Sequence, residues 1–196
     1  IPYHCSFCHD AEAMANVELW FDPFLQNAIY LNIRSDVSGS IIINRSFFQD
    51  GAYKSGIFEH TIMVPDGQPC YCGKKGCVNA YCSISSLLRP QEDIKTFFFK
   101  LRKGTASYER RWNKYLNYLA MAIDNFHMII NSNVILAGTL AKYLADDDIE
   151  LLHLLIQNKS AFPTAEKYIS ISNYSNLPAC MGAALPLVQD YLDSIM

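Results

Sequence analysis

The chain has 196 residues, of which 51% are hydrophobic, and its 16 Lys and Arg against 19 Asp and Glu give a net charge of −3. This length is typical of one domain or one lobe of a two-lobed protein, and the negative charge disfavours direct contact with DNA phosphates, so any DNA partner is expected to bind through a segment outside these residues. The sequence contains no apolar run of the roughly 20 residues that cross a bilayer and no signal-peptide pattern at its start, so we expect a cytoplasmic protein without a membrane partner.

The N-terminal part alternates one helix with short strands. We expect an extended start at residues 3–8, a helix at 11–20, and strands at 28–33 and 40–44. A turn at Arg45 and Ser46 leads to Phe47, and a further short strand is expected at 60–64. The Pro-Asp-Gly sequence at 65–67 predicts a turn after it.

The C-terminal part is richer in helices. Apolar residues at helical spacing predict a long amphipathic helix at 107–130, followed by a short buried strand at 134–137. Further helices are expected from Gly138 and Thr139 onward, at 148–157 and at 178–195, with a strand at 168–172. Pro186 is expected to kink the last helix or to end its first half. The order of these elements predicts an α/β unit with a mixed sheet flanked by helices.

The strongest chemical signal is a cluster of cysteines. Three of the seven cysteines, Cys70, Cys72 and Cys77, fall within eight positions, and glycines at 73 and 76 let the chain fold back on itself. In a reducing compartment such clustered thiols are typical of metal ligands. A structural zinc ion requires four ligands, and the three cysteines supply three of them. Spacing alone leaves the fourth ligand open between His60, which the turn at 65–67 brings back toward the cysteines, and Cys82.

The same segment carries a family resemblance. Gly-Ile-Phe-Glu-His at 56–60, Pro-Asp-Gly at 65–67 and Cys-Tyr-Cys-Gly-Lys-Lys-Gly-Cys at 70–77 resemble the ROK signature, Gly-Glu-x-Gly-His followed by Cys-x-Cys-Gly-x-x-Gly-Cys. ROK stands for repressors, open reading frames and kinases. Weaker matches lie at His9 to Ala13, at Leu136 to Gly138 and at Gly182 to Ala184. The resemblance implies an actin-like, ribonuclease-H-like fold of two lobes.

In that family the chain corresponds to the second lobe. All residues 1–196 are expected to form this single lobe, with a zinc loop at about 60–82. The resemblance implies His60 as the fourth zinc ligand beside Cys70, Cys72 and Cys77, and a first lobe and a DNA-binding domain that lie outside this chain.

The resemblance also implies the residues of a sugar site. Asp10 matches the catalytic base of kinase members, although an Asp at a helix start is also a common N-cap. Asp10, His60 and Asn79 are the expected sugar contacts, and Gly138 matches one glycine of the nucleotide-side turn.

Several family positions have changed. The sugar-binding Glu is replaced by Ile57, the Asn before the base by His9, and the glycine-rich phosphate turn by residues 35–40 with Asp36 in it. A transition state for phosphoryl transfer needs base, substrate contacts and phosphate contacts together, so we expect kinase activity to be lost. The expected function is the sugar- or sugar-phosphate-binding, homodimeric half of a ROK transcriptional regulator, and the alternative is a divergent ROK sugar kinase that phosphorylates a hexose.

Overall fold

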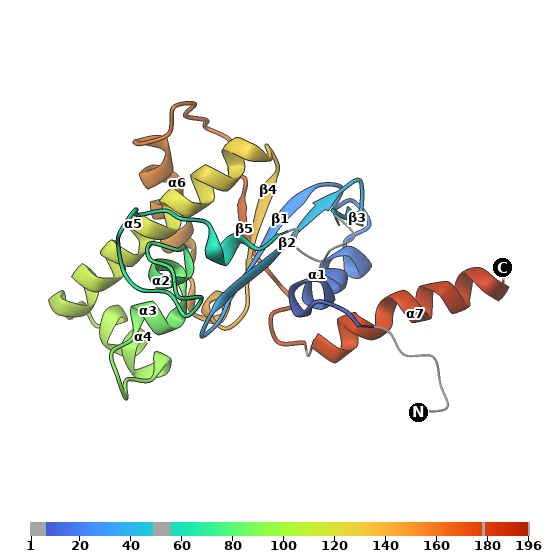
Figure 1. Cartoon of the computed structure of the whole chain (residues 1–196), viewed down its shortest axis with the longest axis horizontal. Coiled ribbons are helices and arrows are strands. Elements are labelled where there is room, and N and C mark those ends of the chain that lie inside the picture. Colours follow the sequence, from blue (N-terminus) through green and yellow to red (C-terminus); the bar gives the residue numbers. More distant parts are fainter. Residues whose placement is uncertain (1–6, 49–55, 178, 196) are drawn as a thin grey trace.

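The structure is a computed structural model that describes residues 7–48, 56–177 and 179–195. Its centre is a five-stranded sheet in the order β3-β2-β1-β4-β5. Strands β1, β4 and β5 run parallel, whereas β2 and β3 continue the sheet antiparallel to their neighbours (Figure 1). The predicted mixed α/β fold is therefore confirmed. The strands are β1 (Ala28–Ile33), β2 (Val37–Ile43), β3 (Ser46–Phe47), β4 (Asn133–Ala137) and β5 (Ile169–Ile171).

Helices cover both faces of the sheet. Helices α1 (Asp10–Phe21) and α7 (Ala179–Ile195) lie on one face, and α5 (Ala106–Ile129) and α6 (Asp146–Gln157) lie on the other (Figure 1). Three shorter helices lie next to α5, namely α2 (Asn79–Cys82), α3 (Ile84–Leu87) and α4 (Ile94–Arg102). The described residues also contain two 3-10 turns, η1 (Phe58–His60) and η2 (Leu140–Tyr143).

Strand β1 is buried along its whole length because it lies between these two helical layers. Ile29 and Leu31 join the core formed with α5, whereas Ala28 and Tyr30 join the core on the side of α1 with Met14. Successive side chains of a strand point to opposite faces, so a strand covered on both faces is apolar at nearly every position. This explains why the run was recognisable from its sequence.

Helices α1 and α7 cross in close contact at a glycine. A Cβ atom on Gly182 would lie 1.6 Å from the carbonyl oxygen of Ala13, so only glycine allows this approach. The helix α7 continues through Pro186, so this proline does not end the first half of the helix. Proline at this position offers no N–H to the carbonyl of Gly182 four residues earlier, and the side chain of Asn16 donates to that oxygen at 3.3 Å instead.

Other local predictions need correction. The strand expected at 60–64 is wrong: η1 ends at His60, and the following residues form a single bridge between Ile62 and Cys77. The turn between β2 and β3 lies at Asn44 and Arg45, both with positive φ, one residue earlier than expected. Among the described residues, no helix is both long enough and apolar enough to cross a membrane.

Candidate functional site

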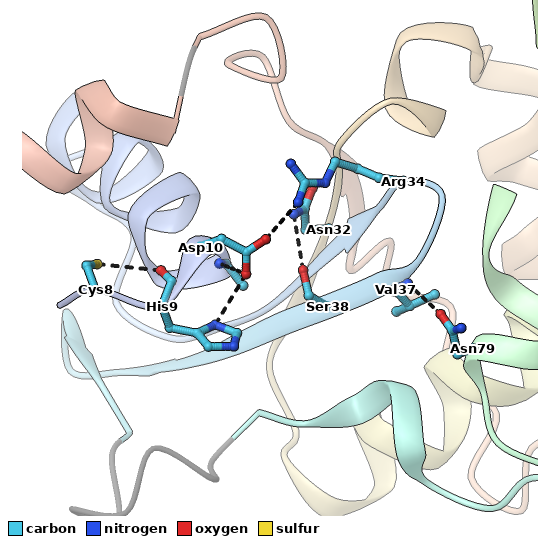
Figure 2. Close-up of polar contacts among 9 residues, drawn as sticks. Cys8, His9, Asp10, Asn32, Arg34, Val37, Ser38 and Asn79 are labelled. Atoms are coloured by element: carbon cyan, nitrogen blue, oxygen red, sulfur yellow. Dashed lines mark hydrogen bonds and ion pairs between the residues drawn. The ribbon is translucent and has the colours of Figure 1, made fainter. Parts of the chain in front are cut away.

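The candidate site lies where the carboxyl ends of the parallel strands β1 and β4 meet the first turn of α1. Open α/β sheets bind ligands at this edge. Asp10 is the first residue of α1, and its side chain is 45% exposed (Figure 2). Its Oδ1 accepts a hydrogen bond from the N–H of Ala11 at 2.9 Å, and its Oδ2 accepts one from Nη2 of Arg34 at 2.7 Å. The N-cap position belongs to His9, so the carboxylate of Asp10 lies within the first turn and faces the site.

Asn79 links the turn between β1 and β2 to the cysteine-rich loop. Its Oδ1 accepts from the N–H of Val37 at 2.7 Å (Figure 2), and its Nδ2 donates to Oδ1 of Asp36 at 3.1 Å. Asn79 is buried, so its amide holds the turn in place from the protein interior. The amide of Asn79 carries no charge, so this contact orients the side chain of Asp36 without neutralising it.

The four residues expected to bind zinc converge. Sγ of Cys70 lies 3.8 Å from Nδ1 of His60, and Sγ of Cys72 lies 3.7 Å from Sγ of Cys77. All four ligand atoms lie within 4.8 Å of one another. A tetrahedron with metal–ligand bonds of about 2.0–2.3 Å has edges of about 3.3–3.8 Å. The four side chains can therefore hold a metal ion.

Local interactions also shape this loop. A Cβ atom on Gly76 would lie 1.8 Å from the carbonyl oxygen of Val64, and the φ of Gly76 is +83°, so this tight bend requires glycine. The hydroxyl of Tyr81 accepts from the N–H of Gln68 at 2.7 Å and fixes the start of the loop on α2.

The thiols of the cluster differ in acidity. Burial raises the pKa of Cys77 to about 12, whereas a backbone hydrogen bond at Lys74 lowers the pKa of Cys72. A buried thiol of this kind ionises when a cation binds beside it. Cys82, the other candidate for the fourth ligand, is not in the group: it is buried on α2, and burial alone raises its pKa.

Gly138 lies directly after β4 and against β1. Its φ is +82°, and a Cβ atom there would lie 2.5 Å from Oδ1 of Asn32. Beside it opens a hollow of about 510 Å³ at the edge of the sheet. The polar side chains that line the hollow are those of Ser35, Ser85, Arg89, Glu92 and Thr139.

Two charged residues near Asp10 were not singled out from the sequence. Arg34 is the ion-pair partner of Asp10. Glu59 lies on η1 directly before His60, and its Oε2 is buried with no hydrogen-bond partner among the described residues. Burial is the main effect on the pKa of Glu59 and raises it. The neighbouring His60 and His9 lower this pKa by less, and Asp10 raises it further.

The position of Glu59 differs from the family pattern in a simple way. Ile57, which stands where the family has its sugar-binding Glu, lines a separate apolar hollow of about 280 Å³ with Phe126 and Ile130. Compared with the Gly-Glu-x-Gly-His signature, this chain has its carboxylate at position 59, where the signature has glycine, and none at position 57. The presence of a Glu two positions after the expected one was the sequence signal that could have identified Glu59 as a site residue.

Comparisons with known proteins identify relatives over most of the chain. The ROK family matches residues 2–190. The N-acetylmannosamine kinase of Haemophilus influenzae (strain 86-028NP) is 29% identical over 157 residues, which cover 70% of this chain and 52% of the kinase. The chain thus spans about half the length of this curated relative.

Solved structures share the fold at low sequence identity. A ROK family glucokinase from Streptomyces griseus, solved with glucose and AMPPNP, matches with a TM-score of 0.77 at 18% identity, over 91% of this chain and 66% of that one. A ROK family transcriptional regulator, a homologue of the E. coli MLC protein, matches with a TM-score of 0.72 at 18% identity, over 90% and 51% of the two chains. At such identities both likenesses concern the fold alone.

The expected function needs correction in the light of these relatives. The main interpretation was a transcriptional regulator without kinase activity, but curated relatives that match over 70% of the chain are N-acetylmannosamine kinases, so the alternative of a divergent ROK sugar kinase is better supported. The sequence argument treated changed family residues as lost contacts, whereas the structure places the side chains of Arg34 and Glu59 near Asp10. The expected DNA partner rested on the same interpretation. With the family matched over residues 2–190, the chain belongs to the ROK family.

Proposed function

We propose that this chain is the second lobe of a ROK sugar kinase, which transfers a phosphoryl group from ATP to a hydroxyl of a hexose or an N-acetylhexosamine. The observation that carries the proposal is the position of Asp10, a half-exposed carboxylate at the carboxyl ends of β1 and β4. Its neighbours fit two substrates. The zinc-loop side offers His60 and Glu59 for a sugar, and the other side opens into a hollow for a nucleotide.

In the proposed reaction Asp10 is the general base. The sugar hydroxyl donates a hydrogen bond to a carboxylate oxygen of Asp10, and its oxygen attacks the terminal phosphorus of ATP. As the new O–P bond forms, the hydroxyl proton passes to Asp10, the bond to ADP breaks, and ADP leaves. Positioning and charge stabilisation carry most of the rate of such reactions.

The nucleotide is proposed to bind in the hollow beside Gly138. The hollow is lined by the hydroxyl groups of Ser35, Ser85 and Thr139 and by the guanidinium of Arg89, and these groups can donate hydrogen bonds to phosphate and ribose oxygens. The close approach of Gly138 to Asn32 keeps the ends of β1 and β4 in register, so the backbone beneath the proposed nucleotide has a fixed position. We assign Gly138 a supporting role in this binding.

Zinc is the proposed metal of the His60, Cys70, Cys72 and Cys77 group. Three thiolates and one imidazole form a closed structural site, without an open position for a substrate. When bound, the ion fixes the loop that carries His60, and so aligns the sugar side of the site. The chemistry of the reaction stays with Asp10.

Three further features belong to the proposal. The chain forms one of two lobes, the protein is cytoplasmic, and it forms homodimers. Free thiols in the described residues suit a reducing compartment, and apolar side chains exposed near η1 and at the end of α5 suit an interface. These apolar residues are Ile57, Ile62, Met128 and Ile129.

An assay of ADP release tests the function. The product of the complete reading frame is incubated with ATP and, in turn, N-acetylmannosamine, glucose and other hexoses, and ADP is measured by a coupled assay. We expect turnover that depends on one sugar class. No ADP release with any of these sugars would overturn the proposal, provided that the protein is folded and loaded with zinc. An Asp-x-Gly-x-Thr phosphate loop in the reading frame before this segment is also expected.

Glu59 provides a test of the sugar side. Its buried oxygen without a partner needs a hydrogen-bond donor, and sugar hydroxyl groups are suitable donors. Glu59→Gln is expected to weaken sugar binding by about 10- to 100-fold, because hydrogen bonds to charged groups contribute about 1.5–3 kcal/mol. Isothermal titration calorimetry measures this, with Glu150→Gln on the far surface as a control. Equal affinities of Glu59→Gln and the unchanged protein would show that Glu59 does not contact the sugar.

A further inference from the structure

Arg34 stands at the boundary between the two halves of the proposed site. Its backbone is fixed on both sides: its N–H donates to the carbonyl of Asp36 at 2.9 Å, and its carbonyl accepts from the N–H of Ile84 at 2.8 Å. The side chain, by contrast, is 49% exposed and reaches across the end of β1 to Asp10 (Figure 2). An anchored backbone with a long, solvent-facing side chain is suited to a change of partner.

The guanidinium of Arg34 has unused hydrogen-bonding capacity. Among the described residues its side-chain hydrogen bond goes from Nη2 to Oδ2 of Asp10 at 2.7 Å, whereas a guanidinium carries five N–H donors. The next residue, Ser35, already lines the hollow that holds Arg89 and Thr139. The side chain therefore begins beside the proposed phosphate region and ends on the proposed base.

The turn around Arg34 is poorly suited to bind phosphate through its backbone alone. Asp36 and Ser38 stand where glycines are common in this family, and the side chain of Asp36 is engaged by Asn79. Without glycines at positions 36 and 38 a phosphate cannot approach the backbone closely there, and the carboxylate of Asp36 adds a negative charge. A phosphoryl group moving toward Asp10 therefore requires a cation from a side chain, and Arg34 is the arginine in contact with Asp10.

We propose that Arg34 binds the transferred phosphoryl group, and that it exchanges Asp10 for this group when the substrates bind. In the free protein Arg34 occupies Oδ2 of Asp10. When the phosphoryl donor is bound, the guanidinium turns to the oxygens of the terminal phosphate, and Oδ2 becomes free to accept the proton of the sugar hydroxyl. The O–P bond to the sugar then forms and the bond to ADP breaks, with Arg34 stabilising the charge on the moving group. This inference rests on the proposed kinase function.

Phosphate binding tests the exchange without the need for activity. Inorganic phosphate is titrated into the zinc-loaded protein and followed by ³¹P NMR. Arg34→Gln is expected to weaken phosphate binding by about tenfold or more, since a charge-assisted hydrogen bond is lost. Arg110→Gln is the matched control, because Arg110 is exposed on α5 and its substitution changes the net charge equally. Exposed ion pairs contribute little to stability, so both variants are expected to fold, which thermal unfolding verifies.

A double-variant cycle separates the exchange from a simple effect of charge. Asp10→Asn releases Arg34 and is expected to strengthen phosphate binding, and this gain should disappear when Arg34→Gln is added. A gain that persists in the double variant would mean that only the negative charge of Asp10 matters, and it would overturn the proposal. Phosphate binding by Arg34→Gln that equals that of Arg110→Gln would overturn it as well.

Kinetics of the active protein complete the test. Arg34→Gln is expected to lower kcat by about 100- to 1000-fold, with sugar affinity within about threefold of the unchanged protein, because the contact forms with the moving phosphoryl group. Arg34→Lys should recover part of the rate. An unchanged kcat in Arg34→Gln would overturn the inference, whereas absence of activity in the unchanged protein would overturn the proposed function itself.

Discussion

Replacement of Asp10 by Asn is expected to lower kcat for sugar phosphorylation by about 100- to 10,000-fold, the range in which a positioned general base accelerates a reaction. Asn retains a side-chain oxygen that can accept the hydrogen bond from the N–H of Ala11, so the first turn of α1 should persist. It has no carboxylate to accept the hydroxyl proton. The measurement is steady-state ADP release at saturating sugar and ATP, together with sugar binding by calorimetry.

The control for this variant is Asp147→Asn. Asp147 is an exposed Asp in the first turn of α6, so its substitution changes charge and helix start in the same way at a distance from the site. We expect its kcat to stay within about twofold of the unchanged protein, since surface substitutions away from special features have small effects. If Asp10→Asn keeps the same kcat as Asp147→Asn, Asp10 is not the base. A large rise in the sugar Kd with unchanged kcat would assign Asp10 to binding alone.

The fold was predictable where a single segment carries its own pattern. Strand β1 is apolar at every position except Asn32 because helices cover both faces, and α5 shows the helical spacing of a long buried face. A strand was expected at 60–64, where the apolar residues Ile62 and Val64 alternate, but the structure has no strand there. In the structure the N–H groups of Met63 and Val64 both donate to the carbonyl of Gly76. The requirement to bring His60 to the cysteines outweighs the local preference.

The site was likewise predictable only where its residues lie within one segment of the chain. The cysteine ligands lie within one short segment, so their spacing alone indicated a metal site. Arg34 and Asp10 are 24 positions apart, and they meet because β1 ends beside the first turn of α1. The carboxylate of Glu59 gains significance from its burial without a partner, which depends on packing around η1. Such contacts between distant elements cannot be derived from composition or periodicity.

Removal of zinc is expected to unfold the loop between His60 and Cys77 and to lower the melting temperature of the protein. The apolar core of β1 and α5 lies outside the loop, so the sheet should persist when the loop opens. Binding free energy at a structural zinc site contributes to the folding of the segment that carries the ligands. Lys74 and Lys75 lie in this loop, so trypsin should cut there after chelation and leave the loop intact when zinc is bound.

Substitution of one ligand should reproduce the effect of the chelator. Cys72 is exposed, so Cys72→Ser removes a thiolate without leaving a cavity, and we expect its zinc affinity to fall by more than about 100-fold, since loss of even an outer partner of a ligand costs about 10- to 100-fold. Cys180→Ser, at another exposed cysteine, should bind one zinc ion as the unchanged protein does. Metal analysis, competition with a zinc chelator and tryptic digestion measure these effects. Retention of stoichiometric zinc by Cys72→Ser in the presence of the chelator would remove Cys72 from the ligand set. Because His60 lies on the sugar side of the site, the zinc-depleted protein should also lose sugar affinity. It should keep its binding of inorganic phosphate, since Arg34 directly follows β1 and its backbone is bonded to Asp36 and to Ile84 of α3, outside the segment between His60 and Cys77.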